Sequence, residues 1–441
     1  MAETVTDDSG KALLVRRIKR IGALFRTDTH NLKAATDSSR GFTGRLFWYS
    51  DQNGFTVPII GNPAKVMLAE DLLFTDGLAE LPWTNIRSEN RWNKTLSVAR
   101  VEQDAAAPVD LYIDPDTGAY AGAVIDPKGD NEEVVRILDY QLVGGKHFVG
   151  RWKYDGAKST TTVSDIKLGA HLTGEDLHPP AQSAHWEFKD KTPFPLRLTA
   201  ERVIIKARVN GVEGTFLLDS GAASIFLSGA FARRAGLKAI GHSESSTLYA
   251  REKTDVGKID TLEIGGNTLH DATVYFGPGE IEDKAPDGLM GFDLLAGAFV
   301  TIDFEKATLQ IRDAGTVDAL NIPGVRIGVD LSLGIPVTTM YVQGKTTTVN
   351  AILDTGSPRA VLISRDLPKT YGLHLASAGV FGGCGTLDNM TLGPIVYDKP
   401  SACTTNFDLH EALLGYDFLK GLSKLHFDYG RATMILTPRS K

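Results

Sequence analysis

The N-terminal part of the chain consists largely of short segments in which apolar and polar residues alternate, separated by turn residues. Residues 109–127, VDLYIDPDTGAYAGAVIDP, hold two such segments around a Pro-Asp-Thr-Gly turn, and residues 134–143 and 147–156 continue the pattern. Alternation places successive side chains on opposite faces of an extended chain, which is typical of half-buried strands. The pattern predicts a β-rich N-terminal domain over residues 1–178.

One segment in this region has a different period. In KALLVRRIKRIGALF, residues 11–25, the apolar residues recur at helical spacing, and Ser9 is positioned to cap a helix. The apolar positions of this face are Leu14, Ile18, Ile21 and Phe25. We therefore predict a leading helix. Its basic residues would also suit an anionic membrane surface, but a helix packed on its own domain is the preferred interpretation.

A change of composition marks the next boundary. Residues 174–197, GEDLHPPAQSAHWEFKDKTPFPLR, carry four prolines and mixed charges, which is typical of an extended linker. We place the linker at 179–195. Two further units are expected after it, at 196–315 and 325–441.

These two units form an internal repeat. In each, a hairpin leads into an apolar strand that ends in Asp-(Ser/Thr)-Gly, and a second apolar strand follows. Later, two apolar residues and a glycine precede a short helix and a final hairpin. The repeated segments are 202–228 with 288–312, and 335–364 with 412–435. The shared order of features is much more specific than any of its short motifs.

Composition limits the classes of function. Of the 441 residues, 42% are hydrophobic and 23% are charged, with a formal net charge of -7. This is ordinary for a globular protein and gives no reason to expect nucleic-acid binding. No stretch approaches the length of a membrane span, and the N-terminus lacks the apolar core of a signal peptide. We expect a cytoplasmic protein, or a periplasmic or secreted one whose export signal was removed before this numbering begins.

Only two cysteines are present, Cys384 and Cys403. They allow one disulfide inside the last unit, but two cysteines in a chain of this length do not fix the redox compartment.

The triplet Asp-(Ser/Thr)-Gly occurs four times, at Asp8, Asp116, Asp219 and Asp354. These residue types favour turns, so the triplet alone is weak evidence of chemistry. Asp116 lies in a hairpin loop and Asp8 in a polar segment before the predicted helix, so we interpret both as turn or cap residues. Asp219 and Asp354 each end an apolar run, where a carboxylate is costly unless something pairs it. These two are the candidate functional residues.

The motifs LLDSGAAS and ILDTGSPR, paired with the later LMG and LLG, resemble the aspartic proteases of the retropepsin-like and pepsin-like kind. The resemblance covers residues 196–441. It implies a mainly β fold in which two closed lobes face each other across a pseudo-two-fold axis, each contributing one aspartate. Because both lobes are in one chain, we expect a monomer.

The resemblance also implies a chemistry. Two close carboxylates share one proton, so one can act as a base toward water while the other donates to a peptide carbonyl. The catalytic residues would be Asp219 and Asp354, the substrate a peptide or protein, and no cofactor or metal would be needed. The residues that would support the catalytic loops are Ser220, Gly221, Thr355 and Gly356.

Substrate-covering flaps are a further feature of this family. VFGGCGTL at 380–387 resembles a glycine-rich flap tip, with Gly382 and Gly383 as candidates for substrate contact. In the first lobe STLYAREK at 246–253 occupies the corresponding stretch, with Tyr249 as the candidate.

The N-terminal domain resembles the half-barrel of lipoprotein carriers, through the alternating strands of residues 110–156. This resemblance implies a sheet curved around an apolar cavity, an apolar ligand and export from the cytoplasm.

Other chemistries lack their motifs. The ten histidines are dispersed without a His-Glu-x-x-His pattern, and no Gly-x-Ser-x-Gly is present. Gly344-Lys345-Thr346 is part of a phosphate-loop pattern, but Thr339 replaces its leading glycine, so we interpret it as a hairpin turn. Two alternatives to a peptidase stay open: a peptide-binding module without turnover, and an envelope carrier whose N-terminal domain binds an apolar ligand.

Overall fold

The computed structural model divides the chain into two compact units. The first is formed by Met1–Trp48 and Ile59–Pro179, and the second by Tyr49–Pro58 and Pro180–Lys441. The structure describes residues 1–75, 78, 81–129, 132–246, 251–277, 286–342, 348–365, 367, 383–405 and 411–439. The fold is mainly β, which confirms the predicted class.

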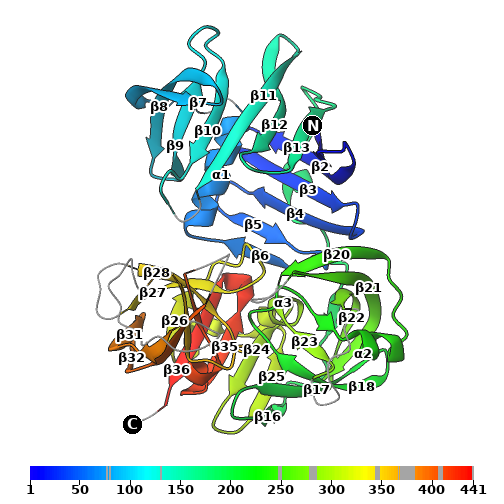
Figure 1. The fold of residues 1–441 in the computed structure, drawn as a ribbon. Coiled ribbons are helices and arrows are strands. Elements are labelled where there is room, and N and C mark those ends of the chain that lie inside the picture. Colours follow the sequence, from blue (N-terminus) through cyan, green and yellow to red (C-terminus); the bar gives the residue numbers. More distant parts are fainter. Residues whose placement is uncertain are drawn as a thin grey trace. The chain divides into compact units, whose positions relative to one another are not determined.

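A single long sheet forms most of the first unit (Figure 1). Its strand order is β6-β5-β4-β3-β2-β1-β13-β12-β11-β10-β9-β8-β7, so most neighbours in the sheet are also neighbours in the chain. The strands are β1 (Ala2–Asp7), β2 (Ala12–Ile21), β3 (Leu24–Asn31), β4 (Thr36–Phe42), β5 (Phe47–Ser50), β6 (Thr56–Ile59), β7 (Trp83–Arg91), β8 (Lys94–Gln103), β9 (Ala106–Ile113), β10 (Tyr120–Ile125), β11 (Glu133–Val143), β12 (Lys146–Tyr154) and β13 (Ser159–Ser164).

Helix α1 (Asn62–Phe74) provides much of the core of this unit. Its buried Val66, Ala69 and Leu73 pack with apolar residues of β9 to β12. A cavity of about 70 Å³ beside the helix is lined by charged side chains, including Arg16, Arg40 and Glu70, as well as by apolar ones.

The predicted leading helix at 11–25 is wrong. These residues form strands β2 and β3, which pair from Leu14↔Asn31 to Ile21↔Leu24. Gly22, with φ of 58°, takes the left-handed conformation that a tight hairpin turn requires. Pairing with β1 and β3 satisfies the backbone groups of β2 on both sides, which outweighs a helical apolar period. Ser9 caps no helix: its hydroxyl donates to Asp7 Oδ1 at 2.6 Å in the preceding hairpin turn.

In the second unit the first repeat forms a nine-stranded sheet. Its order is β14-β22-β19-β23-β18-β17-β21-β20, with β16 beside β17, and an additional pairing of β21 with β22 closes six of the strands into a barrel. The strands are β14 (His185–Glu187), β16 (Arg197–Leu198), β17 (Val203–Val209), β18 (Val212–Leu218), β19 (Phe226–Leu227), β20 (Gly241–Ser246), β21 (Arg251–Ile264), β22 (Asn267–Phe276) and β23 (Gly288–Met290).

The second repeat forms an eight-stranded sheet of order β30-β33-β29-β34-β28-β27-β31-β32. Its β27, β28, β29 and β34 pair as β17, β18, β19 and β23 do in the first repeat. Cys384 and Cys403 face each other on β30 and β33 and form a disulfide. The strands are β27 (Val337–Val342), β28 (Thr348–Leu353), β29 (Val361–Ser364), β30 (Cys384–Thr386), β31 (Asn389–Leu392), β32 (Ile395–Asp398), β33 (Ser401–Thr405) and β34 (Ala412–Leu414).

The closing hairpins of both repeats join in one six-stranded sheet of order β15-β25-β24-β35-β36-β26. Its central contact is the antiparallel pair β24–β35, from Val300↔Phe427 to Asp303↔Lys424. The repeats therefore share a structural base. The strands are β15 (Phe194–Pro195), β24 (Phe299–Asp303), β25 (Thr308–Arg312), β26 (Val325–Gly328), β35 (Leu422–Asp428) and β36 (Thr433–Pro438).

Residues 179–195, where the sequence predicts a linker, are extended and partly paired with the second unit. His185↔His270 begins the pairing of β14 with β22, and Phe194↔Leu309 that of β15 with β25. The remaining helical segments are short: η2 (Gly174–Leu177), α2 (Gly229–Arg234), α3 (Phe292–Ala296), η3 (Ala314–Thr316), η4 (Ala319–Asn321), α5 (Tyr416–Leu419) and η5 (Tyr429–Arg431). Among the described helices, none has both the length and the apolar character needed to cross a membrane.

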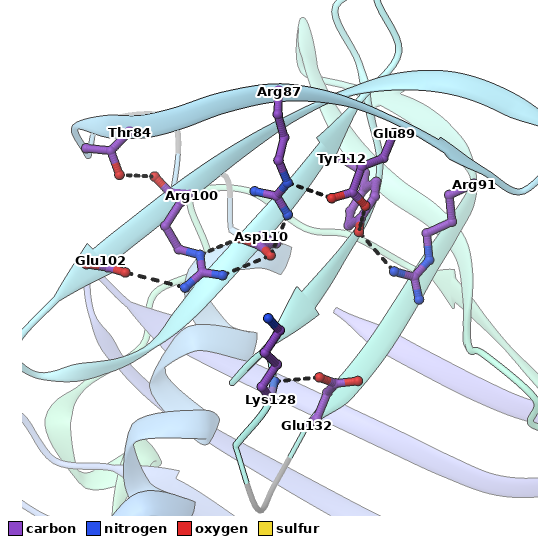
Figure 2. Close-up of polar contacts among 10 residues, drawn as sticks. All are labelled: Thr84, Arg87, Glu89, Arg91, Arg100, Glu102, Asp110, Tyr112, Lys128 and Glu132. Atoms are coloured by element: carbon purple, nitrogen blue, oxygen red, sulfur yellow. Dashed lines mark hydrogen bonds and ion pairs between the residues drawn. The ribbon is translucent and has the colours of Figure 1, made fainter.

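An arginine and carboxylate network stabilises the outer strands of the first unit (Figure 2). The buried Asp110 of β9 accepts hydrogen bonds from Arg87 at 2.9 Å and from Arg100 at 3.0 Å. Arg87 also donates to Glu89 at 2.6 Å, and the Tyr112 hydroxyl donates to Glu89 at 2.8 Å. Burial raises the pKa of Asp110, but the bonds from Arg100 and Arg87 outweigh it and hold this pKa below its usual value.

Asp110→Asn should lower the free energy of unfolding of the first unit by about 1–2 kcal/mol at pH 7, because it removes the charge that pairs two partly exposed guanidinium groups. The folded pKa of Asp110 is lowered, so its contribution exists above the unfolded pKa and is lost as pH falls through the folded pKa. Denaturant unfolding followed by tryptophan fluorescence measures this. Asp116→Asn, in an exposed turn, is the matched control, and an equal loss in both variants would contradict the assignment.

Candidate active site

The first candidate aspartate is positioned by two parallel strands. Strand β18 is buried at Phe216 and Leu218, and it pairs in parallel with β23 up to Leu218↔Met290. One residue later the Asp219 N–H donates to the Met290 carbonyl at 3.0 Å, and the Ala222 N–H donates back to the Asp219 carbonyl at 3.2 Å. The apolar run thus anchors the strand, and the turn after it presents the carboxyl group.

The second repeat builds the same arrangement. Strand β28 ends at the buried Leu353 and pairs in parallel with β34, up to Leu353↔Leu414. The Asp354 N–H donates to the Leu414 carbonyl at 2.9 Å. Both LMG and LLG motifs therefore serve as the strand beside an aspartate loop.

Reciprocal hydrogen bonds join the two loops. The Ser220 N–H donates to Thr355 Oγ1 at 3.0 Å, and the Thr355 N–H donates to Ser220 Oγ at 3.0 Å. Each hydroxyl in turn donates to a carbonyl of the opposite repeat, Ser220 to Leu353 and Thr355 to Leu218, both at 2.7 Å. Both side chains are buried, with at most 1% exposure. The four bonds fix the loops against each other.

The glycines of the triplets bring the carboxyl groups together. A Cβ atom on Gly221 would lie 2.6 Å from Asp354 Cγ, and one on Gly356 would lie 2.3 Å from Asp219 Cγ. Each glycine N–H donates within its own loop, Gly221 to Asp219 Oδ1 at 2.9 Å and Gly356 to Asp354 Oδ1 at 2.7 Å. Any side chain at either glycine would collide with the opposite carboxyl group, so these positions require glycine.

The electrostatics of the pair favour retention of a proton. Burial raises the pKa of Asp219 well above its usual value, and the charge of Asp354 and a hydrogen bond to Asp354 add to the increase. Burial also raises the pKa of Asp354, although the hydrogen bond from Asp219 and the N–H groups of its own loop oppose this. Two adjacent carboxyl groups with these shifts titrate as one unit that keeps a proton into the mildly acidic range.

Two further residues contribute to this environment, and the sequence analysis did not identify either as part of the site. Tyr429 is fully buried against Phe292 and Phe427, and its hydroxyl has no hydrogen-bond partner among the described residues. Burial raises its pKa well above the usual value, with the charges of Asp219 and Asp354 contributing. Asp293, also fully buried, lies in the LMGFDLL motif. The sequence pattern that could have identified Asp293 is an aspartate directly after an aromatic residue in an otherwise apolar segment.

The other predicted residues fall in three groups. Tyr249 and Gly382 lie outside the described residues, as do 344–346. Gly383 is described, and its carbonyl accepts from the Thr404 N–H at 2.8 Å beside the Cys384–Cys403 disulfide. Asp8 and Asp116 lie in hairpin turns of the first unit, consistent with turn roles. Among the described side chains no group of three or more His, Cys, Asp or Glu could hold a metal ion.

The loop-to-loop bonds predict a specific sensitivity at Thr355. Thr355→Ala should lower the free energy of unfolding by about 1–3 kcal/mol, because the buried Ser220 N–H loses its acceptor. Thr355→Ser retains the hydroxyl and copies the residue of the first repeat, so it should preserve most of the stability. Denaturant unfolding of both variants tests this, and equal destabilisation by serine and alanine would exclude a role for the hydroxyl.

The acid pair also predicts a pH dependence of stability. Since the folded pKa of Asp219 is raised, the folded protein holds a proton that the unfolded chain releases, and stability falls as pH rises through that pKa. Asp219→Asn removes the carboxyl group that must lose its proton in the folded protein as the pH rises. The variant should therefore be more stable than the parent by more than about 1 kcal/mol at pH 8, with a smaller difference at pH 4. Unfolding at both pH values measures the difference. A variant that loses stability relative to the parent as pH rises would refute the shared proton.

Residues 205–294 match the family model described as aspartyl protease. Among solved structures, the chain is similar to an aspartic proteinase from Irpex lacteus, with 12% identity over 56% of this chain and 97% of that one and a TM-score of 0.40. It is also similar to a retropepsin-like aspartic protease from Rickettsia conorii, with 17% identity over 26% of this chain and 89% of that one and a TM-score of 0.22. No curated protein matched. The family match confirms the resemblance to aspartic proteases, and the matched segment contains Asp219.

Proposed function

We propose that the second unit is an aspartic-type endopeptidase whose catalytic residues are Asp219 and Asp354. The observation that carries this proposal is the reciprocal packing of each carboxyl group on the glycine of the opposite loop, with a raised pKa at both aspartates. Paired carboxyl groups that share one proton are suited to activate water and to protonate a carbonyl at the same time.

In the proposed reaction the ionised carboxylate takes a proton from water while the water oxygen bonds to the peptide carbonyl carbon. The protonated carboxyl group gives its proton to the carbonyl oxygen, which forms a neutral tetrahedral diol. The nitrogen then takes the proton from the carboxyl group that activated the water, and the C–N bond breaks. A diol hydroxyl gives its proton to the other carboxylate, so the products are a carboxylic acid and an amine and the pair again holds one proton. The Gly221 and Gly356 N–H groups hold the two carboxyl groups in place throughout. All atoms of this reaction come from water, the peptide and the two aspartates.

The substrate is proposed to be a peptide or protein, as the resemblance to aspartic proteases implies. Asp219 is partly exposed, whereas Asp354 is buried, so a substrate would reach the pair from the side of Asp219. Strands β20 and β21 pair as a hairpin, from Gly241↔Val256 to Ser246↔Arg251. This hairpin contains the stretch 246–253, which the resemblance to aspartic proteases makes the candidate flap over the substrate.

Asp219→Asn and Asp354→Asn should each reduce kcat for peptide cleavage by roughly 10²- to 10⁴-fold, because each removes a proton donor or acceptor and keeps the shape. The double variant should lose little more than either single one, since the pair acts as one unit. Steady-state kinetics on a mixed peptide library, with cleavage followed by mass spectrometry, measures both effects.

The matched control is Asp116→Asn, which changes the same triplet in an exposed turn and should retain parental activity. Near-parental cleavage by either Asp219→Asn or Asp354→Asn would refute the two-aspartate mechanism. A parent protein that binds peptides without cleaving any between pH 3 and pH 8, about the range over which carboxyl pairs titrate, would support the peptide-binding alternative instead.

A further inference from the structure

A short segment from much earlier in the chain belongs to the same compact unit as the aspartate loops. Tyr49–Pro58 precedes the predicted linker by more than a hundred positions, yet it groups with Pro180–Lys441. Its Asn53 is completely buried, and its side chain exchanges two hydrogen bonds with the Thr273 backbone, at 3.0 Å and 2.7 Å. The Asn53 carbonyl accepts from the N–H groups of Ser183 and Ala184. This segment is therefore built into the first repeat.

The segment reaches the aspartate loop through Asp293. The Asn53 side chain donates to Asp293 Oδ1 at 2.7 Å, and Gln52 donates to the same oxygen at 3.2 Å. The other oxygen, Oδ2, accepts from the Ser224 hydroxyl and the Ile225 N–H, both at 2.6 Å. Ser224 and Ile225 end the loop that begins at Asp219. Asp293 thus bridges residues 52 and 53 to the C-terminal end of this loop.

Asp51 adds a second carboxyl group to the cluster. One of its oxygens accepts from the N–H groups of Asn53 at 3.0 Å and Phe55 at 2.7 Å. Burial, the charge of Asp293 and a hydrogen bond to Asp293 raise the pKa of Asp51 well above its usual value. Tyr49 and Tyr275 also lie near this pair, and burial raises the pKa of Tyr49 above its usual value, so Tyr49 is neutral where carboxyl groups titrate. Asp51 thus holds the turn at residues 51–55, while its second oxygen is buried without a hydrogen-bond partner among the described residues.

The second repeat offers an internal comparison. Asp417 in GYDFL corresponds to Asp293 in GFDLL, but its side chain is 42% exposed and pairs with Lys420. The position of Ser224 is taken by Arg359, which is exposed. Among the described residues the Asp354 loop has no bridge of this kind, so the support distinguishes the loop that carries Asp219.

We propose that Asp51, Gln52 and Asn53 are positioning residues for Asp219, acting through Asp293 on the end of its loop. The proposal rests on the proposed peptidase function and adds to it a part of the chain outside the two repeats. Because a displacement of about 1 Å at a reacting group costs up to about 10²-fold in rate, a loop held at both ends is an advantage for an acid pair. The first end is held by Ser220 and the second by this bridge.

Asn53→Ala in the full-length protein should reduce kcat for peptide cleavage about 10-fold or more and leave KM nearly unchanged, because the loop is displaced while substrate contacts remain. Hydrogen exchange of the amides of residues 221–225 should become faster, which is measured without any substrate. Asp417→Ala, at the equivalent position of the other repeat, is the matched control and should change neither quantity. Rates are compared per folded molecule, from unfolding curves at the assay temperature.

Asn53→Asp is the conservative variant that separates positioning from general stability. When protonated, the introduced carboxyl group can donate to Asp293 as the amide does, and when ionised it repels Asp293. The ratio of the kcat of this variant to the parental kcat should therefore be near one at the acid end and fall as pH rises. If Asn53→Ala does not fold, this ratio carries the test.

The outcomes are distinguishable. A parent protein without peptidase activity would refute the proposed function, while the exchange rates at 221–225 would still test the bridge. Parental kcat and parental exchange in folded Asn53→Ala would overturn the positioning role. A ratio for Asn53→Asp that does not change with pH would also overturn it.

Discussion

The hydrogen bonds exchanged between Ser220 and Thr355 are the interaction on which the rest of the second unit depends. They bring the ends of two apolar strands so close that each carboxyl group lies against the glycine of the opposite loop. That proximity removes water from the aspartates, which raises the pKa of both, and the charge of Asp354 raises the pKa of Asp219 further. The close approach of the two loops therefore explains why glycine is required in both, why the hydroxyl groups are buried and why the two carboxyl groups form a pair.

Burying two carboxyl groups is unfavourable, and the surrounding structure has to offset that cost. The parallel strands β23 and β34 each accept the N–H of one aspartate, and the shared six-stranded sheet joins both repeats beneath them. The fully buried Tyr429, whose pKa responds to both charges, adds to the desolvated surroundings. A site of this kind is maintained by packing throughout the unit and not by local contacts alone.

The two repeats are alike in topology but unequal in support. Asp293 and Asp417 occupy equivalent positions, and one is completely buried among four hydrogen-bond donors while the other forms a surface ion pair. The difference follows from Gln52 and Asn53, whose side chains donate to Asp293. The equivalent loops therefore have the same topology, but they differ in the hydrogen bonds that reach them.

The sequence by itself determined the mainly β class, the internal repeat and the selection of Asp219 and Asp354 from four similar triplets. These follow from local physics, since apolar runs form strands and an aspartate at the end of such a run needs a partner. The strands at 11–25 could not be recognised, because pairing with β1 and β3 overrides a helical apolar period. Nor could the bridge from Gln52 and Asn53 to Asp293, whose partners are up to 241 residues apart. Only the tertiary structure decides such contacts, because they depend on which surfaces meet after the strands have formed.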